Sequence, residues 1–267
     1  MSDDLIINVE NVTLRFGGVV SLKDVSVEMR RGEILAVIGP NGAGKTSLFN
    51  SITGVYQPQE GTITFLSSQA PPLSVIGKKP HRIAQAGVSR TFQASRLFSA
   101  LTVFENAKIG AENHRGIGLV GALVNGPRTR RGEHESDKVA TEFLKFVGLL
   151  GESNTVASQL SYGARRRLEI ARALATHPEV ILLDEPAAGT NPSEKLELTT
   201  LIRRVRDERG VSVLLIEHDM KLVMALAERL YVLNFGSTIA EGTPEEIRSN
   251  QAVIDAYLGT TTVEKSA

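Results

Sequence analysis

The sequence predicts an α/β fold built around a mainly parallel β-sheet. Three short apolar runs, residues 34–38, 180–183 and 211–216, have the length and composition of strands that are buried on both faces. Segments with a helical pattern lie between them, and buried strands that alternate with helices are typical of a parallel sheet covered on both sides.

The other expected elements follow in chain order. Polar or glycine-rich turns separate three strand-like stretches at the start of the chain, which predict an N-terminal antiparallel β subdomain: residues 5–9, 12–16 and 21–29. Helical and strand patterns then alternate along the core: helices over 45–53, 193–208 and 221–227, and a strand over 230–234.

The middle of the chain has a different pattern. Residues from about 94 to 165 are rich in helical segments, which predicts an α-helical subdomain inserted into the same domain. Its glycine-dotted, basic centre, residues 113–132, is expected to be a loop or irregular hairpin with Arg128, Arg130 and Arg131 in solvent. We therefore expect one domain over residues 5–258 and a flexible polar tail over 259–267.

Composition excludes several classes of function. Thirty basic and thirty acidic side chains give no net charge, so a general electrostatic affinity for nucleic acid is not expected. The absence of cysteine excludes disulfides, thiolate metal sites and thiol catalysis, and five scattered histidines give no structural metal site. The start of the chain does not resemble a signal peptide, and the apolar run 117–124 is too short to span a bilayer. We expect a cytoplasmic protein that reaches a membrane only through a partner.

A complete phosphate-binding motif follows the first buried run. Residues 39–46 read GPNGAGKT, in which glycines let successive backbone amides point at an anion where a helix begins. Lys45 is expected to reach the terminal phosphates of ATP, and the Thr46 hydroxyl to bind Mg²⁺. The expected ATP-binding residues of this loop are Gly39, Asn41, Gly42, Ala43, Gly44, Lys45, Thr46 and Ser47. The alternative is a glycine-rich turn that matches by chance.

Two further strands end in chemically active side chains. Asp184 and Glu185 follow the run 180–183, so both carboxylates are expected at the carboxyl edge of the sheet. There Asp184 can hold Mg²⁺ through a water, while Glu185 can orient or deprotonate an attacking water. His218 follows the next buried run and is suited to positioning the γ-phosphate and that water. Taken alone, the acids could be surface caps and the histidine structural.

The stretch 160–168, LSYGARRRL, resembles the signature motif of ABC-type ATPases. The resemblance covers nearly the whole chain, with the motifs in the family's order, and implies a P-loop NTPase core. It assigns Phe16 to adenine stacking and His218 to the switch histidine. It assigns Gln93 to Mg²⁺, to the attacking water and to communication with a membrane partner.

The resemblance also implies a dimer. A serine and a glycine at a helix start offer a hydroxyl, an amide and the helix dipole to a phosphate. In the family, the positions of Ser161 and Gly163 face the P-loop of a second subunit, so two ATP molecules lie between two chains. A plain N-capped helix running to His177 is an equally valid description of the segment.

Two positions depart from the family pattern. Ala164 stands where the signature usually has glutamine, and Thr190-Asn191 stands where Leu-Asp is common. Both belong to the expected dimer interface. Because neither removes a residue of the hydrolytic centre, we predict an active ATPase.

Local motifs are similar to one subgroup, the ATP-binding subunits of bacterial branched-chain amino acid importers. They are GVSRTFQ at 87–93, RLF at 96–98, LTVFEN at 101–106, LEIAR at 168–172 and GTPEEI at 242–247. The alternatives are the closely similar ATPases of urea or lipopolysaccharide systems, a soluble non-transport ABC ATPase, and a regulatory module that does not hydrolyse ATP.

This resemblance implies several partners. They are a second, identical or different, ATPase subunit, integral membrane permeases and, indirectly, an extracytoplasmic solute-binding protein. The chain would then lie at the cytoplasmic face of the plasma membrane. Residues after Gln93 are expected to form a socket for a permease helix, although the apolar side chains there are equally suited to the core: Leu97, Phe98, Leu101 and Phe104.

Overall fold

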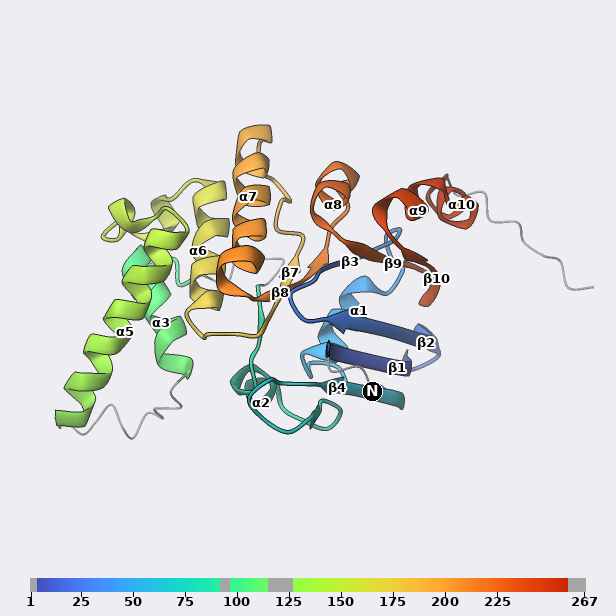
Figure 1. Ribbon diagram of the computed structural model, residues 1–267, viewed down its shortest axis with the longest axis horizontal. Helices are drawn as coiled ribbons and strands as arrows, with labels where there is room; N and C mark the ends of the chain where they lie inside the picture. Colours follow the sequence, from blue (N-terminus) through green and yellow to red (C-terminus); the bar gives the residue numbers. More distant parts are fainter. Residues whose placement is uncertain (1–3, 92–96, 115–126, 259–267) are drawn as a thin grey trace, which may run out of the picture.

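The computed structural model describes residues 4–91, 97–114 and 127–258. Its centre is a six-stranded sheet in the order β10-β9-β3-β8-β7-β6, in which all neighbours are parallel except the edge strand β10 (Figure 1). Its strands are β3 (Ile34–Ile38), β6 (Val88–Arg90), β7 (Val180–Asp184), β8 (Ser212–Ile216), β9 (Arg229–Asn234) and β10 (Ser237–Gly242). Every residue of β3, β7 and β8 is buried, which confirms the predicted α/β fold with a mainly parallel sheet.

The parallel sheet separates two hydrophobic cores. Alternate strand residues enter opposite cores, so that Ile34 and Ala36 pack with the helices on one side while Leu35 and Val37 pack on the other. This alternation follows from the period of two of an extended chain. The second core contains α1 (Lys45–Ile52), α2 (Pro80–Gln85) and the N-terminal strands.

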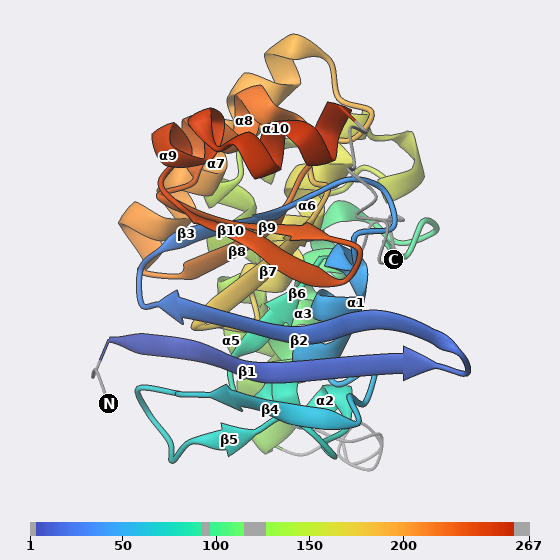
Figure 2. The same cartoon turned by 90° about the vertical axis from the view of Figure 1, so that its right-hand side faces the viewer.

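The N-terminal strands form a separate antiparallel sheet in the order β2-β1-β4-β5, which Figure 2 shows beneath the central sheet. They are β1 (Leu5–Phe16), β2 (Val19–Arg30), β4 (Glu60–Phe65) and β5 (Leu73–Ser74). The prediction of two strands over 5–9 and 12–16 was wrong, because both belong to β1. Asn11 has a φ of 51° and the register with β2 shifts between Val9 and Val12, so the polar residues form a bulge and not a turn.

The first core is covered by four helices of the C-terminal half, α7 (Pro192–Arg209), α8 (Met220–Leu226), α9 (Pro244–Ser249) and α10 (Gln251–Leu258), with the helical subdomain beyond them. Helix α7 begins at a capping box, in which Asn191 and Glu194 each accept a hydrogen bond from the other's amide, and it ends at Gly210 with a φ of 65°. None of the helices within the described ranges is long and apolar enough to cross a membrane.

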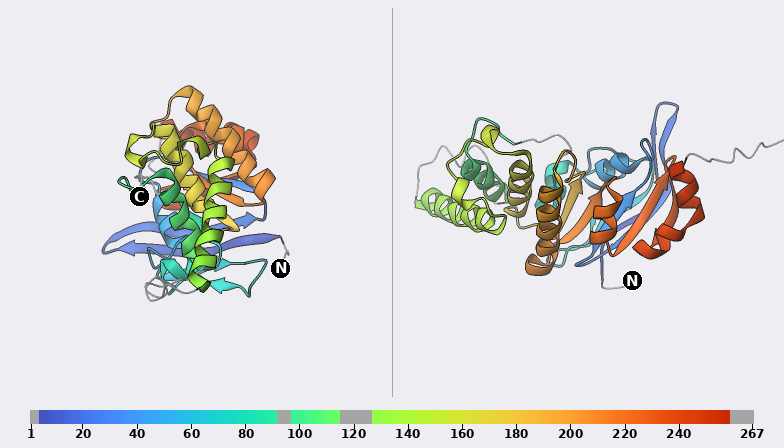
Figure 3. Two further views of the ribbon diagram at one scale, coloured as in Figure 1. Left: turned by 90° about the vertical axis from the view of Figure 1, so that its left-hand side faces the viewer. Right: turned by 90° about the horizontal axis from the view of Figure 1, so that it is seen from above.

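The helical subdomain consists of α3 (Val103–His114), α5 (Pro127–Phe146) and α6 (Tyr162–Leu174), which pack together at one end of the molecule (Figure 3, green and yellow). The predicted loop over 113–132 was wrong where the structure describes it. Arg128, Arg130 and Arg131 lie in α5, because arginine favours helices and Pro127 is tolerated at a first helical position. Residues 115–126 and the tail 259–267 lie outside the described residues.

Helix α6 is shorter than predicted. It ends at Leu174, with Ala175 as its C-cap, whereas the sequence pattern extended it to His177. His177 has a φ of 49°, which a helix does not allow, so the chain turns before Pro178 and enters β7.

Candidate nucleotide-binding and hydrolytic site

Three neighbouring parallel strands end at the same edge of the central sheet. Strand β8 lies between β3 and β7, and its last residue, Ile216, pairs with both Val37 and Asp184. The loops that follow these strands carry the phosphate-loop motif, Glu185 and His218. The strand register therefore brings three segments together that are more than thirty residues apart in sequence.

The phosphate loop has a backbone that depends on its glycines. Gly39, Gly42 and Gly44 have φ values of 150°, 81° and 103°. A Cβ on Gly39 would lie 2.1 Å from the Leu233 carbonyl oxygen, and one on Gly44 would lie 2.7 Å from the Ser21 carbonyl oxygen. Gly44 is also the N-cap of α1 and no side chain caps that end, so the loop has the features of an anion-binding site.

Lys45 lies in the loop with its ammonium group turned back onto it. Its Nζ donates to the carbonyl oxygens of Gly39 at 2.7 Å and Pro40 at 2.8 Å. Burial lowers the pKa of Lys45, and the charges of Glu185 and Asp184 oppose that shift. This opposition shows that the lysine and both acids share one electrostatic environment.

The remaining loop residues differ in exposure. Asn41, Gly42 and Thr46 are exposed, while Ala43 is buried. Ser47 Oγ lies 2.7 Å from Ser21 Oγ, which connects the start of α1 to β2.

Asp184 is buried and forms an ion pair that sequence reasoning missed. Its Oδ2 accepts a hydrogen bond from Arg90 Nη2 at 2.8 Å, with side-chain exposures of 2% and 8%. Arg90, the last residue of β6, also donates to Asn50 Oδ1 at 2.6 Å and to Thr53 Oγ1 at 3.3 Å. The only sequence signal for this role was an arginine two residues before the phenylalanine-glutamine pair at 92–93.

Glu185 and His218 lie next to each other, because they follow the neighbouring strands β7 and β8. His218 Nδ1 is 3.9 Å from Glu185 Oε1, and the His218 side chain is 63% exposed. Glu185 has a φ of 48°, and its amide donates to the Ile216 carbonyl at 2.9 Å. A non-glycine residue with this φ is uncommon and is held in place by its surroundings.

Glu217 is a second residue whose role sequence reasoning missed. Its side chain is fully buried between the two loops. Oε1 accepts from the Ala187 amide at 2.8 Å, while Oε2 accepts from the amides of His218 at 3.0 Å and Asp219 at 3.3 Å. An acid directly after five buried strand residues was the available signal.

Phe16 is the exposed final residue of β1, with 46% exposure. Its ring meets that of Tyr56 edge to face, with centroids 4.9 Å apart. Tyr56 was not among the sequence candidates. Gln93, expected near the same site, lies outside the described residues.

The signature residues belong to the other side of the sheet. Ser161 caps α6 by accepting from the Ala164 amide at 3.2 Å, and the Gly163 amide donates to Glu194 Oε1 at 3.2 Å. Helix α6 packs in one core and α1 in the other, so one chain does not bring its signature to its own phosphate loop. Ala164 is buried, and Thr190 and Glu194 line a cavity of about 200 Å³ beside it.

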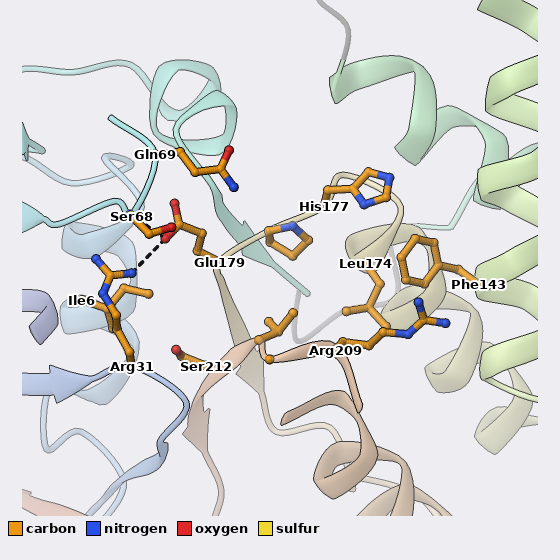
Figure 4. Close-up of a pocket in the computed structure, with 13 residues that line it drawn as sticks. Ile6, Arg31, Ser68, Gln69, Phe143, Leu174, His177, Glu179, Arg209 and Ser212 are labelled. Carbon is orange, nitrogen blue, oxygen red and sulfur yellow. Dashed lines mark hydrogen bonds and ion pairs between the residues drawn. The ribbon is translucent and has the colours of Figure 1, made fainter. Parts of the chain in front are cut away.

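A different cavity, of about 450 Å³, lies near the opposite edge of the sheet, where β7 and β8 begin (Figure 4). Arg31 lines it and is paired with Glu179 at 2.9 Å, while Arg209 is paired with Glu142. Both cations are already paired with carboxylates and the phosphate-loop motif lies at the carboxyl edge, so that edge is the better candidate.

The chain matches known family models and curated relatives. Residues 22–188 match the family model of the ABC transporter, and residues 237–261 match that of the branched-chain amino acid ATP-binding cassette transporter. The high-affinity branched-chain amino acid transport ATP-binding protein LivG of Salmonella typhimurium is 47% identical over 254 residues, which cover 95% of this chain and 98% of LivG.

Two solved structures resemble this fold. The ADP conformation of MJ1267, an ATP-binding cassette of an ABC transporter, has a TM-score of 0.81 at 31% identity and covers 96% of this chain and 99% of its own. The dimeric cassette MJ0796, bound to ADP and Pi, has a TM-score of 0.72 at 26% identity, with 90% and 99% covered. Together with the order of the motifs, these similarities establish that the chain belongs to the ABC transporter family of ATP-binding proteins.

Proposed function

We propose that the chain is the ATP-binding and ATP-hydrolysing subunit of an importer of branched-chain amino acids. The observation that carries the hydrolytic part is the meeting of Lys45, Asp184, Glu185 and His218 at one edge of the sheet. The similarity to LivG over almost the whole of both chains supports the transport part. We take residues 5–258 as one ATPase domain, because both hydrophobic cores share the strands of the central sheet.

The phosphates of ATP fit the loop over residues 39–46. The close approach of other backbone atoms to Gly39 and Gly44 leaves room for no side chain, and the uncapped start of α1 supplies amide donors. Lys45 would exchange its two loop carbonyl acceptors for phosphate oxygens. Phe16, exposed beside Tyr56, would stack on the adenine.

The oxygen donors of Thr46 and Asp184 suit Mg²⁺, which prefers hydroxyl and carboxylate ligands and several waters. When bound, Mg²⁺ supplies charge neutralisation at the phosphates. Gln93 is proposed as a further ligand. Asp184 is held in place by Arg90, so its position is fixed before any cation arrives.

We assign the water to Glu185 and the γ-phosphate to His218. The carboxylate of Glu185 would accept a proton from the attacking water or orient it, and His218 would donate a hydrogen bond to a phosphate oxygen. Attack is direct and in line, without a covalent intermediate. Lys45 and the loop amides would stabilise the charge that develops.

Two chains are proposed to sandwich two ATP molecules. Ser161 and Gly163 would act on the nucleotide of the second subunit, because α6 and α1 lie on opposite sides of the central sheet in one chain. The dimeric structure of the related cassette MJ0796 supports this arrangement. The Gly163 amide would then have to exchange Glu194 for a phosphate.

A groove beside the helical subdomain supports the proposed permease contact at the cytoplasmic face of the membrane. It has a volume of about 330 Å³ and is lined by β6, α2, α3 and α6. Phe98 is 50% exposed there, with the Arg172 guanidinium 6.0 Å from its ring. Leu97 and Phe104 pack against the core and Leu101 is half-buried, so Phe98 is the side chain we assign to the partner.

Hydrolysis is tested by Mg²⁺-dependent phosphate release from the purified chain, alone and with its transport partners. Glu185→Gln should abolish phosphate release. The variant should still bind ATP, and two chains should then form a stable dimer that size-exclusion chromatography detects. The double variant Lys45→Ala/Glu185→Gln is the control and should remain monomeric. Rapid release by Glu185→Gln would contradict the assigned role.

The transported solute is tested in vesicles with permeases and a solute-binding protein. Leucine, isoleucine or valine should stimulate ATP hydrolysis, and urea should not. Phe98→Ser should lose this stimulation and keep basal hydrolysis, whereas Leu196→Ser, which changes a side chain 70% exposed on α7, should keep both. Equal stimulation of the two variants would contradict the proposed contact between Phe98 and the permease.

A further inference from the structure

The carboxylate of Glu217 joins the two loops that carry the proposed hydrolytic residues. Its side chain is completely buried at the end of β8. One oxygen accepts from the Ala187 amide in the loop after β7, and the other accepts from the amides of His218 and Asp219 in the loop after β8. A single side chain therefore fixes the separation of the two loops.

The loop after β7 needs such support. Glu185 has a φ of 48°, a conformation that is costly for a residue with a side chain and persists only where neighbouring contacts enforce it. Its own amide is held by Ile216 and its carbonyl accepts from the Ala188 amide at 3.1 Å. Ala187 lies two residues after Glu185, and its amide donates a hydrogen bond to the Glu217 carboxylate. A side chain from the loop after β8 therefore supports the turn that contains Glu185.

The loop after β8 is held by the same carboxylate and by a second acid. Glu217 binds the His218 amide, which sets the backbone from which the imidazole extends. Asp219 caps α8 by accepting from the amides of Lys221 and Leu222, and it pairs with Lys195 of α7 at 2.6 Å. With Asp219 fixed to the helices, Glu217 fixes His218 relative to Glu185.

We infer that Glu217 is a positioning residue for ATP hydrolysis, which sets the distance and orientation between Glu185 and His218. The inference rests on the proposed roles of those two residues. Glu217 is buried away from solvent and acts through three main-chain amides, so it need not touch ATP.

Glutamine at position 217 is the sharpest perturbation, because it preserves shape but supplies only one acceptor oxygen. Directed at His218 and Asp219, its carbonyl keeps two bonds, and its NH₂ group then faces the Ala187 N–H, donor against donor. The turn that holds Glu185 should shift. A displacement of about 1 Å at a reacting group can lower the rate by about 100-fold, so we expect kcat to fall by about 10- to 100-fold.

Glu179 provides a matched control at the other end of β7. Its carboxylate is also largely buried and multiply bonded, to the Arg31 guanidinium, the Ser67 hydroxyl and the Ser68 amide. It lies near the opposite edge of the sheet from Glu185. Glu179→Gln should lower thermal stability and leave kcat within about twofold of wild type.

The experiment measures kcat and KM for phosphate release, binding of a fluorescent ATP analogue and Tm. The kcat of Glu217→Gln should fall by about 10- to 100-fold, while its affinity for nucleotide stays within about twofold of wild type. Glu217→Asp, one methylene too short to span both loops, should lose kcat in the same way. Inactive wild-type protein would contradict the proposed function itself.

Three results with active wild type would overturn the inference. They are a kcat for Glu217→Gln equal to that of Glu179→Gln, a loss of nucleotide affinity as large as the loss of kcat, and failure of both Glu217 variants to fold while Glu179→Gln folds.

Discussion

Substitution of Arg90 by methionine isolates the buried ion pair beneath the proposed site. The Asp184 carboxylate is 2% exposed and Arg90 is 8% exposed, so the variant leaves a buried charge without its cation. Removing one partner of a buried pair costs about 3–5 kcal/mol of unfolding free energy. At roughly 2 °C per kcal/mol for a chain of this size, Tm should fall by roughly 6–10 °C. Urea unfolding followed by circular dichroism measures the free energy directly.

A second substitution separates the uncompensated charge from simple loss of packing. In Arg90→Met/Asp184→Leu no buried charge remains, and apolar replacement of a whole buried pair is often neutral or stabilising. The double variant should therefore be more stable than Arg90→Met, although inactive. Arg15→Met is the control, because its pair with Glu60 is exposed by 45% and 57% and should contribute within about 1 kcal/mol. An Arg90→Met variant as stable as Arg15→Met, or a double variant that is the least stable of all, would refute this role of the buried ion pair.

Three further substitutions test the loop and the α8 cap. Lys45→Ala should weaken ATP binding at least about tenfold, measured by calorimetry, since its ammonium would pair with the phosphates; unchanged affinity would contradict this. Gly39→Ala should prevent ATP binding and lower Tm, because the Cβ would lie 2.1 Å from the Leu233 carbonyl oxygen. A variant that binds ATP and keeps the wild-type Tm would show that no such clash occurs. The hydrogen bond from Lys195 lowers the pKa of Asp219, with burial opposing and the cap amides adding. Its contribution to stability is therefore full above the unfolded pKa, about 3.9, and is lost as pH falls through the folded value. Urea unfolding at several pH values should show wild type losing its advantage over Asp219→Asn below about pH 4; a difference that stays constant with pH would refute this.

Strands β3, β7 and β8 of the central sheet were predictable because they are short, apolar and buried on both faces, whereas the partly exposed edge strands β6 and β10 were not predicted. Residues 34–38 and 180–183 carry that pattern in full, and the positions of Glu185 and His218 followed from the rule that parallel strands place their carboxyl ends together. The bulge at Asn11 was not predictable, because a polar residue with positive φ is equally common in a turn.

The contacts of Asp184 and Glu217 could not be predicted from the sequence for a different reason. Arg90 and Asp184 are separated by 94 residues, and their contact depends on the register of β6 against β7, which Arg90 and Leu182 define. Nothing in the local sequence encodes that register. The same holds for Glu217, whose acceptor oxygens meet an amide thirty residues earlier in the chain.

The site concentrates features that are unfavourable when taken singly. Glu185 has a strained backbone, burial is the main cause that lowers the pKa of Lys45, and Asp184 is a buried charge. Each is compensated by a specific contact: Ile216 of β8 holds Glu185, the carbonyls of the loop after β3 hold Lys45, and Arg90 of β6 holds Asp184. Because these compensating groups lie on β8, on β6 and directly after β3, the geometry of the site depends on the strand register. A change that shifts one strand should therefore disturb all three side chains together, even where it touches none of them.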